Sequence, residues 1–130
     1  MSYYMAATSS RPFEAVVTNV IETLRAEGFG VLTDIDVQAT LKAKIGVQTS
    51  KYRILGACNP QLAHQALQIE NKLGVLLPCT VIVRETTDGR VEVASVDPVA
   101  AMERTGNERL TSTAGDVKQR LSRALAAVIP

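Results

Sequence analysis

The chain has 130 residues, of which 46% are hydrophobic and 21% charged, the balance of an ordinary globular protein. This length predicts one domain, residues 1–130, with enough core to fold without disulfide or metal staples. The net charge is +1, the basic residues are spread along the chain, and Trp is absent. Together these features argue against nucleic acid as a partner, because they provide neither an electrostatic footprint nor a stacking platform.

The N-terminal stretch MSYYMAATSSRPFEA lacks the basic region and long apolar core of a signal peptide. The longest apolar run, GVLLPCTVIV, is too short to span a bilayer and is interrupted by Pro78. We therefore expect a soluble, cytoplasmic protein that has no membrane partner. In a reducing compartment its two cysteines are expected to be free.

In the N-terminal half, apolar residues at intervals of three and four predict a helix over residues 11–27, ended by Gly28. Asp36 as N-cap and Gly46 after the last turn bound a shorter helix. Alternation of apolar side chains is typical of half-buried strands. The strands predicted in this half are residues 2–8, 30–36 and 51–58.

In the C-terminal half, Asn59 suits the N-cap and Pro60 the first turn of a helix that runs to about Glu70 or Lys72. The stretch CTVIVRETTDGRVEVASVD is typical of a β-hairpin, because Asp88-Gly89 between two β-rich runs is a strong two-residue turn signal. Two further helices are predicted over residues 98–102 and 113–128.

A two-residue turn fixes the register of this hairpin, with Thr87 opposite Arg90 and Thr80 opposite Asp97. One predicted face of the hairpin holds Cys79, Val81, Val83, Ala94 and Val96. The other predicted face holds Thr80, Ile82, Arg84, Val91, Val93, Ser95 and Asp97.

Strands that alternate with helices, then a hairpin, then closing helices predict an α+β fold. We expect a single mixed or antiparallel sheet of about five strands packed with helices. Such a sheet has two edges, and both faces of its hairpin are half apolar. These features favour a homodimer.

The two cysteines are the first candidates for chemistry. Cys58 precedes the N-cap Asn59, and amides at a helix start favour a thiolate. The same position also suits a hydrophobic staple against Ala63, which would make Cys58 a packing residue. Cys79 opens a strand and shares a face with Val81. Packing, redox or ligand chemistry, and a Cys58–Cys79 disulfide all stay open.

His64 falls on the polar side of its helix, which predicts a solvated side chain and removes the base that a Cys-His nucleophile pair needs. Glu70 falls in the apolar half of the same helical wheel, where a carboxylate needs a partner or a raised pKa. It is a general acid/base or ligand contact, or it pairs with an arginine such as Arg53, or the helix ends before it. We predict that Glu70 is partly buried beside the thiols.

No Cys-x-x-Cys motif, Cys/His cluster or glycine-rich phosphate loop is present in the sequence. Asp34 and Asp36 form at most a weak metal pair, and Asp36 is better explained as a helix cap. Arg53 and Arg84 either bind an anionic ligand or are ordinary surface residues. We therefore predict no metal site and leave the cofactor unassigned.

The stretches GFGVLTDIDVQATLKAKIGVQTSKYRILGACNPQLAHQALQIENKLGVLLPCTVIVRE and SVDP resemble a family of small bacterial and archaeal proteins, the domain of unknown function 302. The resemblance covers about residues 13–102 and leaves the helix at about 113–128 outside it. It implies a compact α+β domain and no particular activity. It draws attention to Cys58, Asn59, Pro60, Glu70, Pro78, Cys79, Asp97 and Pro98.

Two functions are consistent with the sequence. The first is a ligand-binding or protein-interaction module with an apolar pocket or dimer groove, and its candidate partners are a small-molecule ligand and a second copy of the chain. The alternative is a thiol-based redox or soft-metal-binding activity centred on Cys58 and Cys79. The sequence does not decide whether the protein is an enzyme, and no catalytic residue is assigned. The candidate ligand or redox site comprises Cys58, Cys79, Glu70 and Asn59, with the two thiols close together and reduced.

Overall fold

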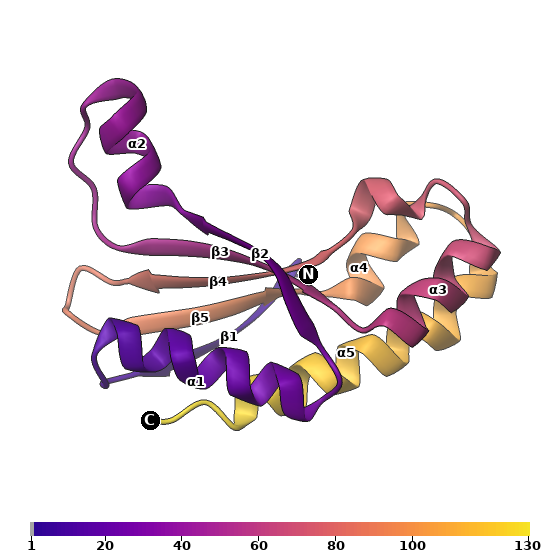
Figure 1. Ribbon diagram of the computed structural model, residues 1–130. Helices are drawn as coiled ribbons and strands as arrows, with labels where there is room; N and C mark the ends of the chain where they lie inside the picture. The colour runs from indigo at the N-terminus through magenta and orange to yellow at the C-terminus, as the bar shows by residue number, and fades with distance from the viewer. Residues whose placement is uncertain (1) are drawn as a thin grey trace.

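The computed structural model describes residues 2–130 and contains one antiparallel sheet of five strands in the order β1-β5-β4-β3-β2. Helices α1 and α5 run side by side along one face of the sheet (Figure 1). The strands are β1 (Tyr4–Ser9), β2 (Gly30–Asp36), β3 (Tyr52–Cys58), β4 (Cys79–Glu85) and β5 (Val91–Val96). The helices are α1 (Phe13–Ala26), α2 (Val37–Ile45), α3 (Pro60–Ile69), α4 (Pro98–Glu103) and α5 (Thr111–Ala126), with short 3-10 helices η1 (Leu73–Leu76) and η2 (Glu108–Leu110).

The predicted α+β fold is confirmed, and its sheet is antiparallel throughout. The helix starts predicted at Asp36, Asn59 and Asp97 are also confirmed by their caps, whereas the first and last helices begin at Phe13 and Thr111 and not at residues 11 and 113. Asp36 Oδ1 accepts a hydrogen bond from the Ala39 amide at 2.9 Å. Asp97 Oδ1 likewise accepts one from the Val99 amide at 2.9 Å. A side-chain oxygen at the N-cap satisfies an amide that the first turn leaves without a partner, so these residues fix where the helices begin.

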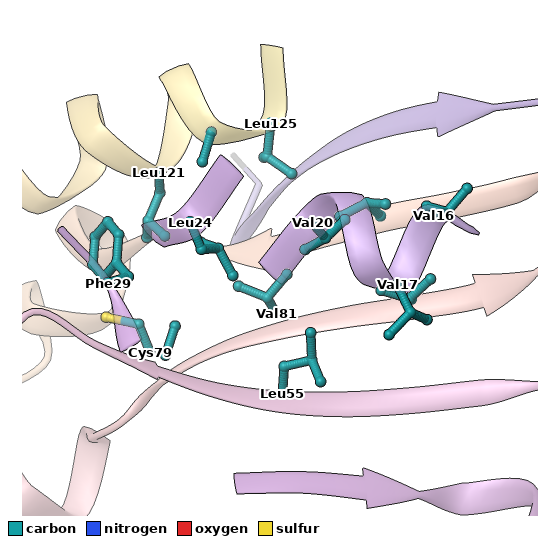
Figure 2. Packing of buried hydrophobic residues seen from close by; sticks show 14 of the residues in the cluster. Val16, Val17, Val20, Leu24, Phe29, Leu55, Cys79, Val81, Leu121 and Leu125 are labelled. Atoms are coloured by element: carbon teal, nitrogen blue, oxygen red, sulfur yellow. The ribbon is translucent and has the colours of Figure 1, made fainter. Parts of the chain in front are cut away.

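The main hydrophobic core lies between the two long helices and the sheet, as Figure 2 shows. The apolar stripe of α1 faces strands that include β4, and α5 lies beside α1 over β5 and β1. Burial of these aliphatic side chains is the main favourable contribution to folding, at about 1.5–3 kcal/mol for each one. The buried residues labelled in the figure include Val16, Val20, Leu24, Leu55, Val81, Leu121 and Leu125.

The predicted hairpin register is wrong by one residue. Thr86 donates its amide to the Arg90 carbonyl at 2.9 Å, so the loop has three residues and Gly89 takes its left-handed position with φ of 81°. Val81 lies opposite Ser95 and Val83 opposite Val93. A slip of one residue exchanges the faces of a strand. Val91 and Val93 therefore enter the core with Val81 and Val83, whereas Ala94 and Val96 lie on the other face with Ile82.

Asp97 ties α4 to α5 in addition to capping α4. Its Oδ2 lies 2.9 Å from Lys118 Nζ, and the residue is only 9% exposed. Burial alone would raise the pKa of the Asp97 carboxyl, but the hydrogen bond from Lys118 and those from the amides of Ala100 and Val99 outweigh it, so this pKa is lowered. The contact stabilises the fold above the usual carboxyl pKa and is lost as the pH falls through the lowered value.

Two parts of the structure are not packed against another layer of the fold. The face of the sheet opposite α1 and α5 carries no helix, and α2 projects away from the rest of the molecule beside the β2–β3 connection (Figure 1). None of the residues of α2 is buried. Over residues 2–130, every helix is too short or too polar to cross a membrane.

Gly56 allows a close approach between β3 and the segment that leads into β4. A Cβ atom at this position would lie 2.7 Å from Pro78 Cγ and would also collide with Thr33 Oγ1. Real Cβ contacts essentially never come so close. The Leu77-Pro78 segment can therefore lie against β3 only because residue 56 has no side chain.

We predict that Gly56→Ala destabilises the protein by about 1–3 kcal/mol, the usual cost of overpacking a closed interior. Gly30→Ala, a substitution in β2 where a Cβ would meet nothing within 4 Å, is the matched control and should be near neutral. Urea unfolding followed by circular dichroism measures both variants. Equal stability of the two variants would contradict this account of Gly56.

Candidate functional site

A cavity of about 310 Å³ lies where β3 leads into α3 at one end of the sheet. Apart from the two thiols, the polar side chains in its wall are those of Asn59 and Thr113, and among residues 2–130 no charged side chain lines it. Its wall is formed by Phe29, Leu32, Ala57, Cys58, Asn59, Leu62, Ala63, Ala66, Leu67, Gly74, Leu77, Pro78, Cys79, Met102, Thr113 and Val117. The cavity is therefore an apolar chamber with a few polar groups.

Both thiols line this cavity, and neither is bridged. Ala57 pairs with Cys79 across β3 and β4, and Cys58 is the next residue along β3. Cys58 is half-buried, whereas Cys79 is only 7% exposed. The two cysteines thus line the same cavity and differ in their access to solvent.

The route by which the thiols meet differs from the one expected. The expected route required one shared apolar face along β3 and β4. In the structure Ile54 pairs with Ile82 on the open face, whereas Cys79 lies on the core side with Val81 and Val83. Cys58 follows Ala57, the residue opposite Cys79, and so alternates to the other side of the strand, and both cysteines line the cavity at the end of the sheet.

The environment of Cys79 suppresses its ionisation. Burial raises the pKa of the Cys79 thiol to about 11, and the charge of a Cys58 thiolate nearby adds to the effect. Figure 2 shows Cys79 beside Phe29 at one end of the buried cluster. At neutral pH Cys79 is therefore a protonated thiol in apolar surroundings, poorly suited to act as a nucleophile.

Asn59 shapes the cavity through its backbone position and its amide. Its Oδ1 accepts a hydrogen bond from the Leu62 amide at 3.1 Å and so fixes the start of α3. Its Nδ2 occupies the space beside Gly28, where a Cβ would come within 2.8 Å of it and where φ is +89°. The absence of a side chain at Gly28 therefore leaves room for the Asn59 amide beside the α1–β2 turn, and Phe29, the next residue, lines the cavity.

Glu70 does not lie beside the thiols, which corrects that prediction. It is half-buried, as expected, but it follows the last residue of α3, so the ten residues of that helix, about 15 Å, separate it from Asn59. Its Oε1 accepts a hydrogen bond from Asn107 Nδ2 at 3.4 Å. Because the backbone of Glu70 is already extended, its side chain does not follow the helical wheel from which its position was predicted.

The other polar candidates also lie away from the cavity. His64 is exposed, as predicted from the polar side of its helix. Arg53 pairs with Asp34, which lowers the pKa of the Asp34 carboxyl through their hydrogen bond, and Arg84 pairs with Glu92 at 2.8 Å. Over residues 2–130, no three His, Cys, Asp or Glu side chains gather into a group that could hold a metal ion.

The sequence motifs missed part of the cavity wall. Leu32 points into it from a bulge in β2, where pairing passes from Val31 directly to Thr33. Met102 and Val117 come from the C-terminal region, at sequence distances that periodicity cannot relate to Cys58. The helical periodicity of residues 113–128 did place Val117 on the apolar side of α5. That signal could have indicated that this helix forms part of the cavity wall.

We predict that the free energy of unfolding falls by about 2–3 kcal/mol between pH 9 and pH 11 because of Cys79 alone, since one pKa unit corresponds to about 1.36 kcal/mol. The folded thiol has a pKa raised from 9.0 to about 11, so its contribution is complete below pH 9 and is lost as the pH rises. Urea unfolding of the wild type and of Cys79→Val across this range isolates the effect. Parallel pH profiles for the two proteins would contradict it.

Comparison with known proteins agrees with the fold. The solved structures include that of an uncharacterized conserved DUF302 protein from Bacillus stearothermophilus, which is similar to this chain at 26% sequence identity with a TM-score of 0.93, covering 98% of this chain and 99% of the other. No curated protein matches the chain. The family model described as domain of unknown function DUF302 matches residues 5–128, which includes the C-terminal helix as well as the motif region. The chain therefore belongs to the DUF302 family.

Proposed function

We propose that this protein binds a small, largely apolar molecule in the cavity between α3, α5 and the end of the sheet. The observation that carries the proposal is the combination of about 310 Å³ of space with a wall free of charged side chains. The cavity opens to solvent, so it is a surface pocket and not a sealed void. Clefts of this volume with a mainly apolar wall and a few polar groups are typical binding sites for small molecules.

The size and chemistry of the cavity limit the ligand class. Ligand pockets begin at about 300 Å³ and combine apolar walls with a small number of polar groups. A cavity of about 150 Å³ accommodates benzene, so this one matches a molecule of about two fused rings or a short alkylbenzene. The amide of Asn59, the hydroxyl of Thr113 and the two thiols are the polar groups that would orient it.

The rim supports access from solvent. Leu32 is 68% exposed and Leu67 is 37% exposed, and both line the cavity. Exposed large aliphatic side chains around an opening are typical of ligand-binding grooves. An apolar molecule would therefore pass over an apolar rim before it reached Cys79 and Phe29.

We predict that naphthalene and n-butylbenzene raise the thermal unfolding temperature of the wild type. A ligand at a hundred times its dissociation constant stabilises the folded state by about 2.7 kcal/mol. Ala63→Met, which fills the cavity from α3, should abolish this shift. Gln65→Met, on the exposed side of the same helix, adds the same side chain outside the cavity and should leave the shift intact.

Calorimetric titration with the same two hydrocarbons gives the stoichiometry, which should be one per chain. Loss of the shift in Gln65→Met as well as in Ala63→Met would show a non-specific effect of methionine. The absence of any shift in the folded wild type at hydrocarbon saturation would contradict the proposal.

A second candidate function is the binding of a soft metal ion by the two thiols. The observation that favours it is that Cys58 and Cys79 line one cavity. Thiolates select soft ions such as Cu(I). The apolar wall would exclude harder ions, which prefer oxygen ligands and water. Because metal binding must displace the proton of Cys79, affinity should rise steeply with pH.

Anaerobic titration with Cu(I) against a competing chelator tests this candidate. One equivalent should bind, and Cys58→Ser and Cys79→Ser should each remove it. Binding that survives either single substitution would rule out a site built from both thiols.

We also propose that the protein works in the cytoplasm, where a reducing environment keeps paired thiols free. Cell fractionation followed by detection with an antibody to the protein tests the location directly. Recovery of the protein in an oxidising compartment would contradict this assignment.

A further inference from the structure

We propose that the ligand cavity continues past Met102 into a second cavity, and that the complete site takes an alkyl chain ending in a protonated amine. The inference rests on the proposed function and deepens it, because it names the class of ligand. It concerns the end of the molecule where α3, α4 and α5 gather (Figure 1). The argument begins from the second cavity itself, which the ligand-binding proposal leaves unused.

The second cavity has a volume of about 260 Å³ and lies between α4, η2 and the start of α5. The apolar part of its wall includes Val99, Met102, Leu110 and Ala114. A cavity of about 150 Å³ accommodates benzene, so this one has room for a substantial further segment of a ligand.

The two cavities are neighbours along α5. Thr113 and Val117 line the first, whereas Thr111 and Ala114 line the second. Residues 113 and 114 are consecutive, and consecutive residues of a helix lie only about 1.5 Å apart along its axis. The same turns of α5 therefore serve both cavities, and no further element of secondary structure has to be displaced to join them.

Met102 separates the two cavities. Among residues 2–130 it alone lines both, and it is only 6% exposed. It packs in a small apolar cluster with Ala66 from the wall of the first cavity and Ala114 from the wall of the second. Methionine is unbranched, has three rotatable bonds and adapts to irregular spaces. Because this side chain has a hollow on either side, its rotation would connect the two cavities into one site.

The connected site is apolar at one end and anionic at the other. Glu103 and Glu108 are the charged residues that line the second cavity, and over residues 2–130 neither carboxylate forms a salt bridge. Arg104 and Arg109 follow them in the chain but do not line this cavity, and Arg104 lines a different depression beside η1. Since the first cavity has no charged side chain in its wall, the electrostatic preference of the site is for a cation at the α4–η2 end.

A primary alkylamine matches both ends. Its amino group resembles that of lysine, with a pKa of about 10.4, so it is positively charged at neutral pH. Each buried methylene raises affinity by about fourfold, whereas an exposed ion pair raises it by up to about fivefold. The chain therefore supplies most of the affinity, and the two carboxylates select the head group.

Calorimetric titration of the full chain with n-decylamine and n-decanol tests the head group, because the two ligands share one alkyl chain. The wild type should bind the amine at least threefold more tightly than the alcohol. The double variant Glu103→Gln/Glu108→Gln changes two exposed side chains. It should remove this preference by weakening amine binding, and it should leave the affinity for the alcohol unchanged.

Met102→Ala tests the connection between the cavities. It removes the side chain that must rotate, so the competent state is populated without ligand, and the affinity for n-decylamine should rise at least threefold. The affinity for n-butylbenzene, which the first cavity holds alone, should change by less than twofold. Met5→Ala is the matched control, because Met5 packs against the main core outside both cavities and its loss should alter neither affinity. Circular dichroism establishes folding, and the head-group comparison decides the matter if Met102→Ala does not fold.

The outcomes separate this inference from the proposed function. If n-butylbenzene binds but the wild type does not distinguish decylamine from decanol, the inference is overturned and the first cavity stands as a ligand site. The same holds if Met102→Ala folds and behaves like Met5→Ala. If none of the three ligands binds the folded wild type, both proposals are wrong.

Discussion

The packing of α1 and α5 against a single face of the sheet is the interaction on which the other features depend. It commits Val81, Val83, Val91 and Val93 to the core and so decides which side of every strand is buried. Two helices are enough to cover one face and cannot reach the other. The apolar cavity lies at the end of the sheet, where α3 and η1 take over as cover. The other face of the sheet stays without a covering helix (Figure 1).

The starts of three helices could be predicted from the sequence because the hydrogen bonds that fix them join residues close together in the chain. Asp36, Asn59 and Asp97 accept hydrogen bonds from amides two or three residues away, so their role is visible in the sequence itself. The hairpin register was not visible in the same way. Asp88-Gly89 fits a two-residue turn and also the last two positions of a three-residue turn, and the choice between them rests on the contacts of Thr86 and on the core.

The candidate site was predictable in its thiols and not in its walls. Cys58 and Asn59 are adjacent in the sequence and Cys79 opens the neighbouring strand, but the expected shared face is not there, because Ala57 and not Cys58 is paired with Cys79. Glu70 was misplaced because the wheel assumes a continuing helix, and α3 ends one residue earlier. Leu32 reaches the cavity through a bulge in β2, and Met102 reaches it through tertiary packing. Neither feature produces a periodic pattern in the sequence.

The three-residue hairpin loop makes the chain tolerate insertions and deletions unequally. An extra residue between Thr86 and Arg90 lengthens an exposed connection and leaves the ladder in place. Removal of one residue leaves only two choices, to break the Thr86–Arg90 bond or to slip β5 by one position. The slip would turn Val91 and Val93 outward and present Glu92 to the core. Length variation among sequences of this fold should therefore be biased toward longer loops here.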